Sequence, residues 1–262
     1  MRFRTLSILI VPIGLYLVAP AAIGQETTPE KATTMRHGAS HAPPTPKELD
    51  DAATPIVDLE APAPTDEARI AKSKRYDRQA VVQPNLAPSA VAVVVSGSGG
   101  DSDLPAADSD LVVEGTVTAS EAFLSNDRGS VYSEFTVHVT DTLKVAPGIK
   151  VHAGDTIAAE RWGGRVRYPN GRIVRYGVAG LGSLREGRKY LLFLAAAGAG
   201  NYRILTAYDV HGSDVRAVDG SNARTRPGNW SADKHNGQKY GAFRADVDAE
   251  IKNPHPVKRF LP

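Results

Sequence analysis

Residues Arg165-Val-Arg-Tyr-Pro-Asn-Gly-Arg-Ile-Val-Arg-Tyr176 decide the fold class of this chain. Asn170-Gly171 can supply the two positive-φ residues of a type I′ turn, and the flanking residues alternate between apolar and charged. The pattern therefore predicts a β-hairpin with a two-residue loop, set in an antiparallel β domain. The same hairpin gathers arginines on a small area, which makes it the clearest candidate for a binding surface.

Other strand patterns lie on both sides of the hairpin. They span residues 111–118, 131–143, 155–162, 189–195, 202–206 and 215–218. Most of them alternate between apolar and polar residues, whereas residues 189–195 are apolar without alternation, which is typical of a strand covered on both faces. About seven short strands separated by turns predict a small barrel or sandwich.

The first 24 residues have the three parts of a secretory signal peptide. Met1-Arg-Phe-Arg4 is positive, an apolar run extends from Leu6 to Val18, and small residues follow up to Gly24, where we expect cleavage. The apolar run is short for a membrane span. We therefore expect an exported protein, periplasmic or extracellular, with no membrane span in the mature chain. An uncleaved N-terminal anchor is the alternative.

Residues 25–103 predict a disordered arm, because they are rich in Pro, Thr, Ala and charge and contain few large apolar side chains. Within the arm, residues 66–80 contain helix formers, with acids in the first turn and bases later, and could form a marginal helix. We expect the folded domain to occupy residues 104–220.

Residues 221–262 predict a tail that contains one helix. Between residues 240 and 252, the apolar side chains Phe243, Val247 and Ile251 recur at four-residue spacing. This spacing indicates an amphipathic helix with a single apolar stripe, which we expect to pack on the β domain.

The strand sequences resemble a known type of domain. Asp110-Leu-Val-Val-Glu-Gly-Thr-Val117, Val131 to Lys144, Asp155-Thr-Ile and Gly187-Arg-Lys-Tyr-Leu-Leu-Phe-Leu194 follow in the order found in exported, uncharacterised bacterial β domains. Those domains look OB-like, in the manner of the tissue-inhibitor-of-metalloproteinase and netrin-module barrels. The resemblance covers roughly residues 107–220. It implies a mainly β fold: a small antiparallel OB-like barrel with a protruding hairpin, completed by the C-terminal amphipathic helix and the disordered N-terminal arm.

Composition excludes several kinds of chemistry. The chain has no cysteine, which excludes thiol catalysis, thiolate zinc sites and disulfides. It also lacks the N-terminal cysteine by which the resembling inhibitors reach zinc, so no inhibitory residue can be transferred to it. Residues 107–220 carry 13 basic and 13 acidic side chains, which argues against a specific nucleic-acid binder. His37 and His41 have helical metal-ligand spacing, but they lie in the arm, so we expect no metal and no cofactor.

The hairpin supplies the candidate binding residues. With a two-residue loop, Arg165, Arg167 and Arg172 would share one face with Tyr176, near Trp162. Arginine forks bind carboxylates and phosphates in a bidentate way, and an aromatic ring can stack on a ligand. An alternative explanation is that the arginines only keep an exposed ribbon soluble, and that Trp162 only packs.

No catalytic signature is present in the sequence. We therefore expect a non-enzymatic interaction module of the cell envelope or extracellular space, whose partner is a protein or an anionic polymer bound at residues 162–176. Two alternatives stay open. One is a hydrolase in which Glu134 and Glu160 face each other as acid and base. The other is a metalloprotease inhibitor, by analogy of fold.

Overall fold

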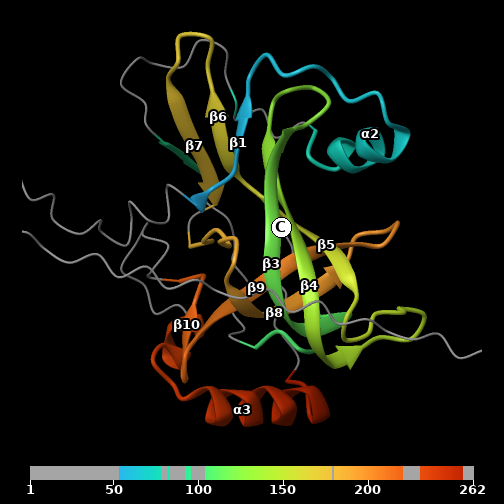
Figure 1. The fold of residues 1–262 in the computed structure, drawn as a ribbon, viewed down its shortest axis with the longest axis vertical. Helices are drawn as coiled ribbons and strands as arrows, with labels where there is room; N and C mark the ends of the chain where they lie inside the picture. Colours follow the sequence, from blue (N-terminus) through green and yellow to red (C-terminus); the bar gives the residue numbers. More distant parts are fainter. Residues whose placement is uncertain are drawn as a thin grey trace, which may run out of the picture. The chain divides into compact units, whose positions relative to one another are not determined.

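The computed structural model describes residues 53–77, 82, 92–95, 104–178, 180–220 and 231–255 (Figure 1). The predicted signal segment 1–24 and much of the predicted arm lie outside them. The elements are β1 (Ile56–Asp58), α2 (Glu67–Lys74), β2 (Ala92–Val95), β3 (Leu111–Leu124), β4 (Val131–Val145), β5 (Thr156–Trp162), β6 (Gly164–Arg167), β7 (Ile173–Val178), β8 (Lys189–Ala196), β9 (Asn201–His211), β10 (Asp214–Ala217), η2 (Ser231–His235, a 3₁₀ helix) and α3 (Tyr240–Lys252). The prediction of a mainly β chain is confirmed.

Five strands form a closed ring of backbone hydrogen bonds. Around the ring the order is β3, β4, β5, β9 and β8, and β8 pairs again with β3. All these pairs are antiparallel except β5 with β9, which is parallel. The interior is filled by every second residue of the strands, among them Val113, Phe135 and Val137. This set agrees with the alternation of apolar and polar residues in the sequences of residues 111–118 and 131–143.

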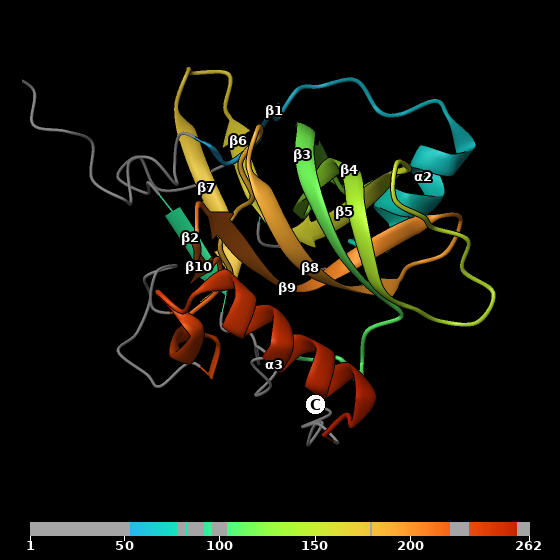
Figure 2. The same ribbon diagram turned by 60° about the horizontal axis from the view of Figure 1, so that its bottom comes forward.

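A second apolar core lies outside the ring, under α3. Leu191 and Phe193 of β8 point into it, whereas Leu192 and Leu194 point into the ring. This confirms the prediction of a strand covered on both faces. Helix α3 spans the residues predicted to form an amphipathic helix, and it contributes Phe243 and Val247 to this core, with Ile251 partly buried beside them. Figure 2 shows α3 running along the outside of the strands.

The hairpin loop contains three residues rather than two. The Tyr168 carbonyl accepts from the Gly171 amide at 2.8 Å, and the Tyr168 amide donates to the Arg172 carbonyl at 2.8 Å. Gly171 alone has a positive φ, of 80°. These are the features of a type I turn followed by a glycine bulge. Pro169 explains the choice, because its ring fixes the φ that the first central position of a type I turn requires.

The extra loop residue shifts β7 by one position, so the predicted division of the hairpin faces was wrong. Arg165 lies opposite Arg175, and Arg167 lies opposite Ile173. A shift of one residue moves every side chain of a strand to the other face. Tyr176 therefore points away from Arg165 and Arg167, into a third apolar core, where it is 1% exposed.

The hairpin does not protrude alone, which corrects the expected architecture. Strand β1 pairs in parallel with β6, and β2 pairs in parallel with β7, giving a four-stranded sheet in the order β1-β6-β7-β2. The prediction of disorder was likewise wrong for residues 53–65, which include β1, whereas the marginal helix predicted within residues 66–80 is present as α2. We call residues 53–77 the arm segment. An isolated two-stranded ribbon has two bare edges and little stability, and the N-terminal strands cover both edges.

A buried ion pair connects the ring to the loops at one end. Arg161 of β5 donates to both oxygens of Asp219 at 2.6 and 3.0 Å, and the two side chains are about 5% exposed. Asp219 also accepts from the Gly182 amide and the Thr206 hydroxyl. The remaining polar capacity of the carboxylate is thus satisfied, as burial of a charge requires.

We expect Asp219→Ala to lower the free energy of unfolding by about 3–5 kcal/mol, because it leaves the Arg161 guanidinium buried and unpaired. The control is Asp58→Ala, which removes an exposed ion pair to Arg167 and should cost less than about 1 kcal/mol. Urea unfolding at pH 7 measures both. Equal losses in the two variants would contradict the role of the buried pair.

Candidate functional site

Helix α2 begins at a well-formed N-cap. The carboxylate of Asp66 accepts from the Arg69 amide at 2.9 Å, and Glu67 lies in the first turn. Lys72 and Lys74 lie in the last turn, where cations favour the helix dipole. The sequence of this short helix therefore favours both its start and its end.

Three cations of the arm segment bind a pair of glutamates on the outside of the ring. Glu134 of β4 and Glu160 of β5 lie directly opposite each other. Arg69 Nη1 donates to Glu134 at 3.0 Å, and Lys72 Nζ binds the same carboxylate. Arg75 Nη2 donates to both oxygens of Glu160, at 2.6 and 2.7 Å. Spacing of three residues puts the cations on one side of the helix, so α2 and its C-cap residue Arg75 together neutralise both carboxylates.

Aromatic rings complete the contact between the arm segment and the ring. Tyr76 stacks on Tyr132 with ring centroids 4.2 Å apart and planes 6° from parallel. The Ser73 and Tyr132 hydroxyls are 3.0 Å apart. Burial, together with the nearby Glu160 carboxylate, raises the pKa of Tyr76 well above its ordinary value. Tyr132 and Glu134 point out of the ring, as expected, but they face the arm segment rather than solvent.

The two glutamates lie opposite each other, as the hydrolase hypothesis requires, but the pKa of Glu134 is not raised as a general acid would require. Burial favours a raised pKa for Glu134, but the hydrogen bonds from Lys72 and Arg69 outweigh burial and lower the pKa below its usual 4.5. A general acid needs the opposite shift. Both carboxylates also accept hydrogen bonds from cations, which favours their charged form.

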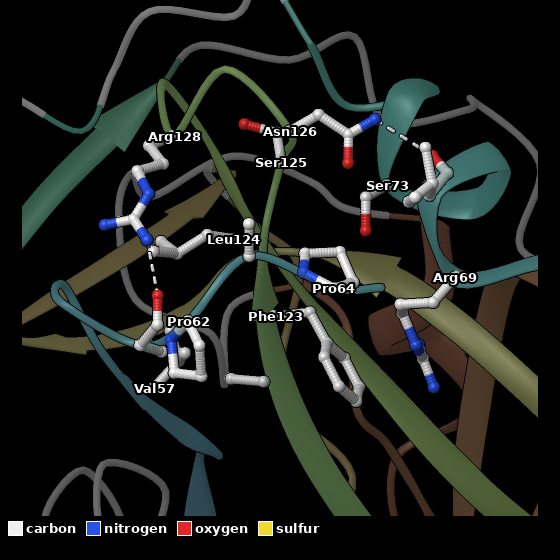
Figure 3. Close-up of a pocket in the computed structure, with 14 residues that line it drawn as sticks. Val57, Pro62, Pro64, Arg69, Ser73, Phe123, Leu124, Ser125, Asn126 and Arg128 are labelled. Carbon is white, nitrogen blue, oxygen red and sulfur yellow. Dashed lines mark hydrogen bonds between the residues drawn. The ribbon is translucent and has the colours of Figure 1, made fainter. Parts of the chain in front are cut away.

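A pocket of about 570 Å³ lies beside α2 (Figure 3). One wall is the end of β3 and the turn after it, and the other is the arm segment. Its apolar lining includes Val57, Pro62, Pro64, Ile70, Phe123 and Leu124. Both the size and the apolar lining are typical of small-molecule sites. The pocket lies between the arm segment and the end of β3.

Two side chains of the β3–β4 turn fasten the arm segment over this pocket. Arg128 Nη1 donates to the Leu59 carbonyl at 2.8 Å, and its Nη2 donates to the Ala61 carbonyl. The Asn126 amide donates to the Ile70 carbonyl at 2.9 Å, and Figure 3 shows this bond on the opposite side of the pocket from Arg128. Arg128 has a φ of 57°, a conformation that is uncommon for a residue with a side chain. The turn thus places polar groups at both ends of an apolar pocket.

The structure separates Arg172 and Tyr176 from Arg165 and Arg167, which stay on one face of the hairpin. Arg165 Nε donates to the Thr54 carbonyl at 2.7 Å, and Arg167 binds Asp58 at 3.0 Å. Arg172 lies at the bulge, with its guanidinium 5.1 Å from the centre of the Tyr168 ring. Trp162 is half-buried, and its indole N–H donates to the Ser130 hydroxyl at 2.6 Å.

The described residues contain neither a candidate metal centre nor a helix able to span a membrane. No group of three or more His, Asp or Glu side chains in the described ranges is arranged to hold a metal ion. None of the helices in those ranges has the length and apolar character needed to cross a membrane. His37 and His41 lie outside the described residues.

Comparison with known proteins does not assign this chain to a family. No protein-family model matches the chain, and no curated protein matches it.

Sequence reasoning named Glu134 and Glu160 but missed the cations that bind them and the residues that line the pocket. Arg69, Lys72 and Arg75 were part of a charged helix with a thin apolar face, which suggested marginal order. Their three-residue spacing was the available signal, because it indicates a cationic face that requires acidic partners. Phe123 and Leu124 gave no signal, because they extend β3 beyond the predicted strand.

We expect Glu134→Gln to lower the free energy of unfolding at pH 7 by roughly 1–3 kcal/mol, because Lys72 and Arg69 lose a charged acceptor. The lowered pKa of Glu134 implies that its stabilisation is present above about 4.5 and is lost as pH falls through the folded-state pKa. The difference between wild type and variant should therefore shrink towards pH 3. Urea unfolding from pH 7 to pH 3 measures it.

Glu60→Gln is the matched control, since Glu60 is an exposed glutamate of the arm segment that takes no part in the contact with Glu134. Its difference from wild type should stay near zero at every pH. A Glu134→Gln difference that grows as pH falls would contradict the ion-pair interpretation.

Proposed function

We propose that this protein is an exported, non-enzymatic binding module that takes a small apolar ligand into the pocket beneath the arm segment. The observation that carries the proposal is the pocket of about 570 Å³, whose walls are largely apolar and whose polar groups gather at its ends. The positive, apolar and small-residue parts of residues 1–24 support export.

We also propose that the ring of strands is an OB-like barrel. Five strands close in the order β3-β4-β5-β9-β8, which supports this assignment. OB-folds bind ligands on the face of their second and third strands and on the loops beside it. Here the corresponding elements are β4, β5 and the β3–β4 turn, and the arm segment and the pocket lie against them. The position of the pocket thus agrees with the fold proposal.

The proposal favours binding over catalysis. The only acid pair considered in the sequence, Glu134 with Glu160, is occupied by three cations, and the pKa of Glu134 is lowered. These features favour a structural role for the pair over an acid–base role. The metalloprotease-inhibitor hypothesis stays a prediction from resemblance.

Binding of the neutral dye Nile red, followed by fluorescence, tests the proposed function. We expect saturable binding to the purified chain and roughly tenfold weaker binding to Ala63→Trp, because Ala63 is exposed at the pocket lining and an indole there would obstruct entry. Ala68→Trp is the control, since Ala68 is an exposed α2 residue that does not line the pocket. Absence of saturable binding, or equal binding to both variants, would contradict the proposal.

A second candidate function has one observation in its favour. The corrected register places Arg165, Arg167 and Arg175 on the same face of the hairpin, with the exposed Ile173 between them. This face is the remaining candidate for an anionic polymer or an acidic protein. The ion pair of Arg167 with Asp58 is exposed, and such a pair is weak enough to be replaced.

Chromatography on heparin tests this second function. If the hairpin face binds polyanions, the Arg167→Ala/Arg175→Ala double variant should elute at a clearly lower salt concentration than wild type, because two phosphate or sulfate contacts are lost. Arg172→Ala is the control, because Arg172 lies at the bulge rather than on this face. Equal elution of all three proteins would reject the hairpin face as the polymer site.

A further inference from the structure

Arg128 has a feature that distinguishes it from the other arginine of the pocket. Both of its bonded acceptors, the Leu59 and Ala61 carbonyls, are neutral. Within the described ranges, no carboxylate forms an ion pair with Arg128. Arg69, in contrast, binds the Glu134 carboxylate. A guanidinium is always charged and offers five N–H donors, so Arg128 brings a positive charge to the pocket that its protein partners do not neutralise.

The two arginines lie on opposite sides of the pocket. Figure 3 shows Arg128 on one side and Arg69 on the other, with Leu124 and Phe123 between them. The Arg69 guanidinium lies 3.7 Å from the centre of the Phe123 ring. The pocket therefore has a net positive charge at one side, at Arg128, and is apolar in the middle.

A ligand that matches this polarity has an apolar body and one anionic end. The body would lie on Leu124 and Phe123, facing Pro62 and Pro64 of the arm segment. Arg128 has N–H donors beyond the two that hold the arm segment, and an anion that accepts from them forms a charge-assisted hydrogen bond, about twice as strong as a neutral one. A cationic head would be repelled, and a neutral head would gain little.

We propose that the natural ligand is an alkyl monocarboxylate whose carboxylate binds Arg128 and whose chain fills the apolar pocket. This inference rests on the proposed binding function, and it specifies the chemical class of the ligand. A carboxylate suits the site because the planar guanidinium can bind its two oxygens side by side. The pocket walls are apolar enough to bury a chain that carries no further polar group.

Calorimetry on the purified full chain, with three probes of the same chain length, tests the inference. Decanoate, decanol and decylamine share the apolar chain and differ only in the head group. At pH 7.5 and below the concentrations at which these probes aggregate, we expect decanoate to bind at least about tenfold more tightly than decanol, and decylamine to bind most weakly.

Substitutions at Arg128 assign this preference to one residue. Arg128→Gln should remove the preference for decanoate over decanol. Arg128→Lys should keep part of it, because the positive charge stays although the bidentate geometry is lost. Arg203→Gln, at an exposed arginine of β9 outside the pocket, should behave like wild type. Decanol affinity reports whether the pocket is intact in each variant. If Arg128→Gln also loses decanol binding, the preference for decanoate over decanol in Arg128→Lys tests the assignment instead.

The outcomes separate this inference from the proposed function. Equal binding of the three probes would overturn the ligand class and leave the binding function standing. No binding of any probe would overturn both. A preference for decanoate that persists in Arg128→Gln, or that is lost in Arg128→Lys while decanol still binds, would overturn the assignment of the carboxylate to Arg128.

Discussion

Carboxylates on the outer face of the strand ring are the constraint on which the rest of the structure depends. Glu114, Glu134 and Glu160 point away from the apolar interior, yet each is largely buried. A buried carboxylate is costly unless a cation and hydrogen bonds accompany it. Both helices supply such cations: Arg244 of α3 binds Glu114 at 2.7 Å, and the arm segment binds the other two. These ion pairs fix the positions of the helices together with the apolar contacts of Phe243 and Val247 and the stacking of Tyr76 on Tyr132.

The same constraint places the candidate ligand pocket. Because α2 is held at Glu134 and Glu160, the chain that leads to it must cross the end of β3, and the space left under that crossing is the pocket. One wall is part of the ring and is held by strand pairing. The other wall is held by side-chain contacts from Arg128, Asn126 and Arg69. Conditions that weaken ion pairs therefore act on this wall before they act on the ring.

The hairpin shows how a local choice of turn changes a proposed function. The alternation of residues 165–176 predicted the two strands and their antiparallel pairing, and both are present. The loop was one residue longer than expected, because Pro169 favours a type I turn and Gly171 then forms a bulge. That single residue buried Tyr176 and separated Arg172 from the other arginines. A binding site predicted on the face of a strand is therefore correct only if the predicted strand register is correct.

Short-range patterns in the sequence determined the elements of this protein: the mainly β composition, the inward residues of β3 and β4, the doubly covered β8 and the amphipathic α3. Alternation and four-residue spacing are local, so the sequence alone carries them. Only the tertiary structure decided that residues 53–65 are ordered, that Glu134 and Glu160 are covered, and that Phe123 and Arg128 line a pocket. These features join residues more than 40 positions apart, and their stability arises from ion pairs and burial that exist only after the ring has closed.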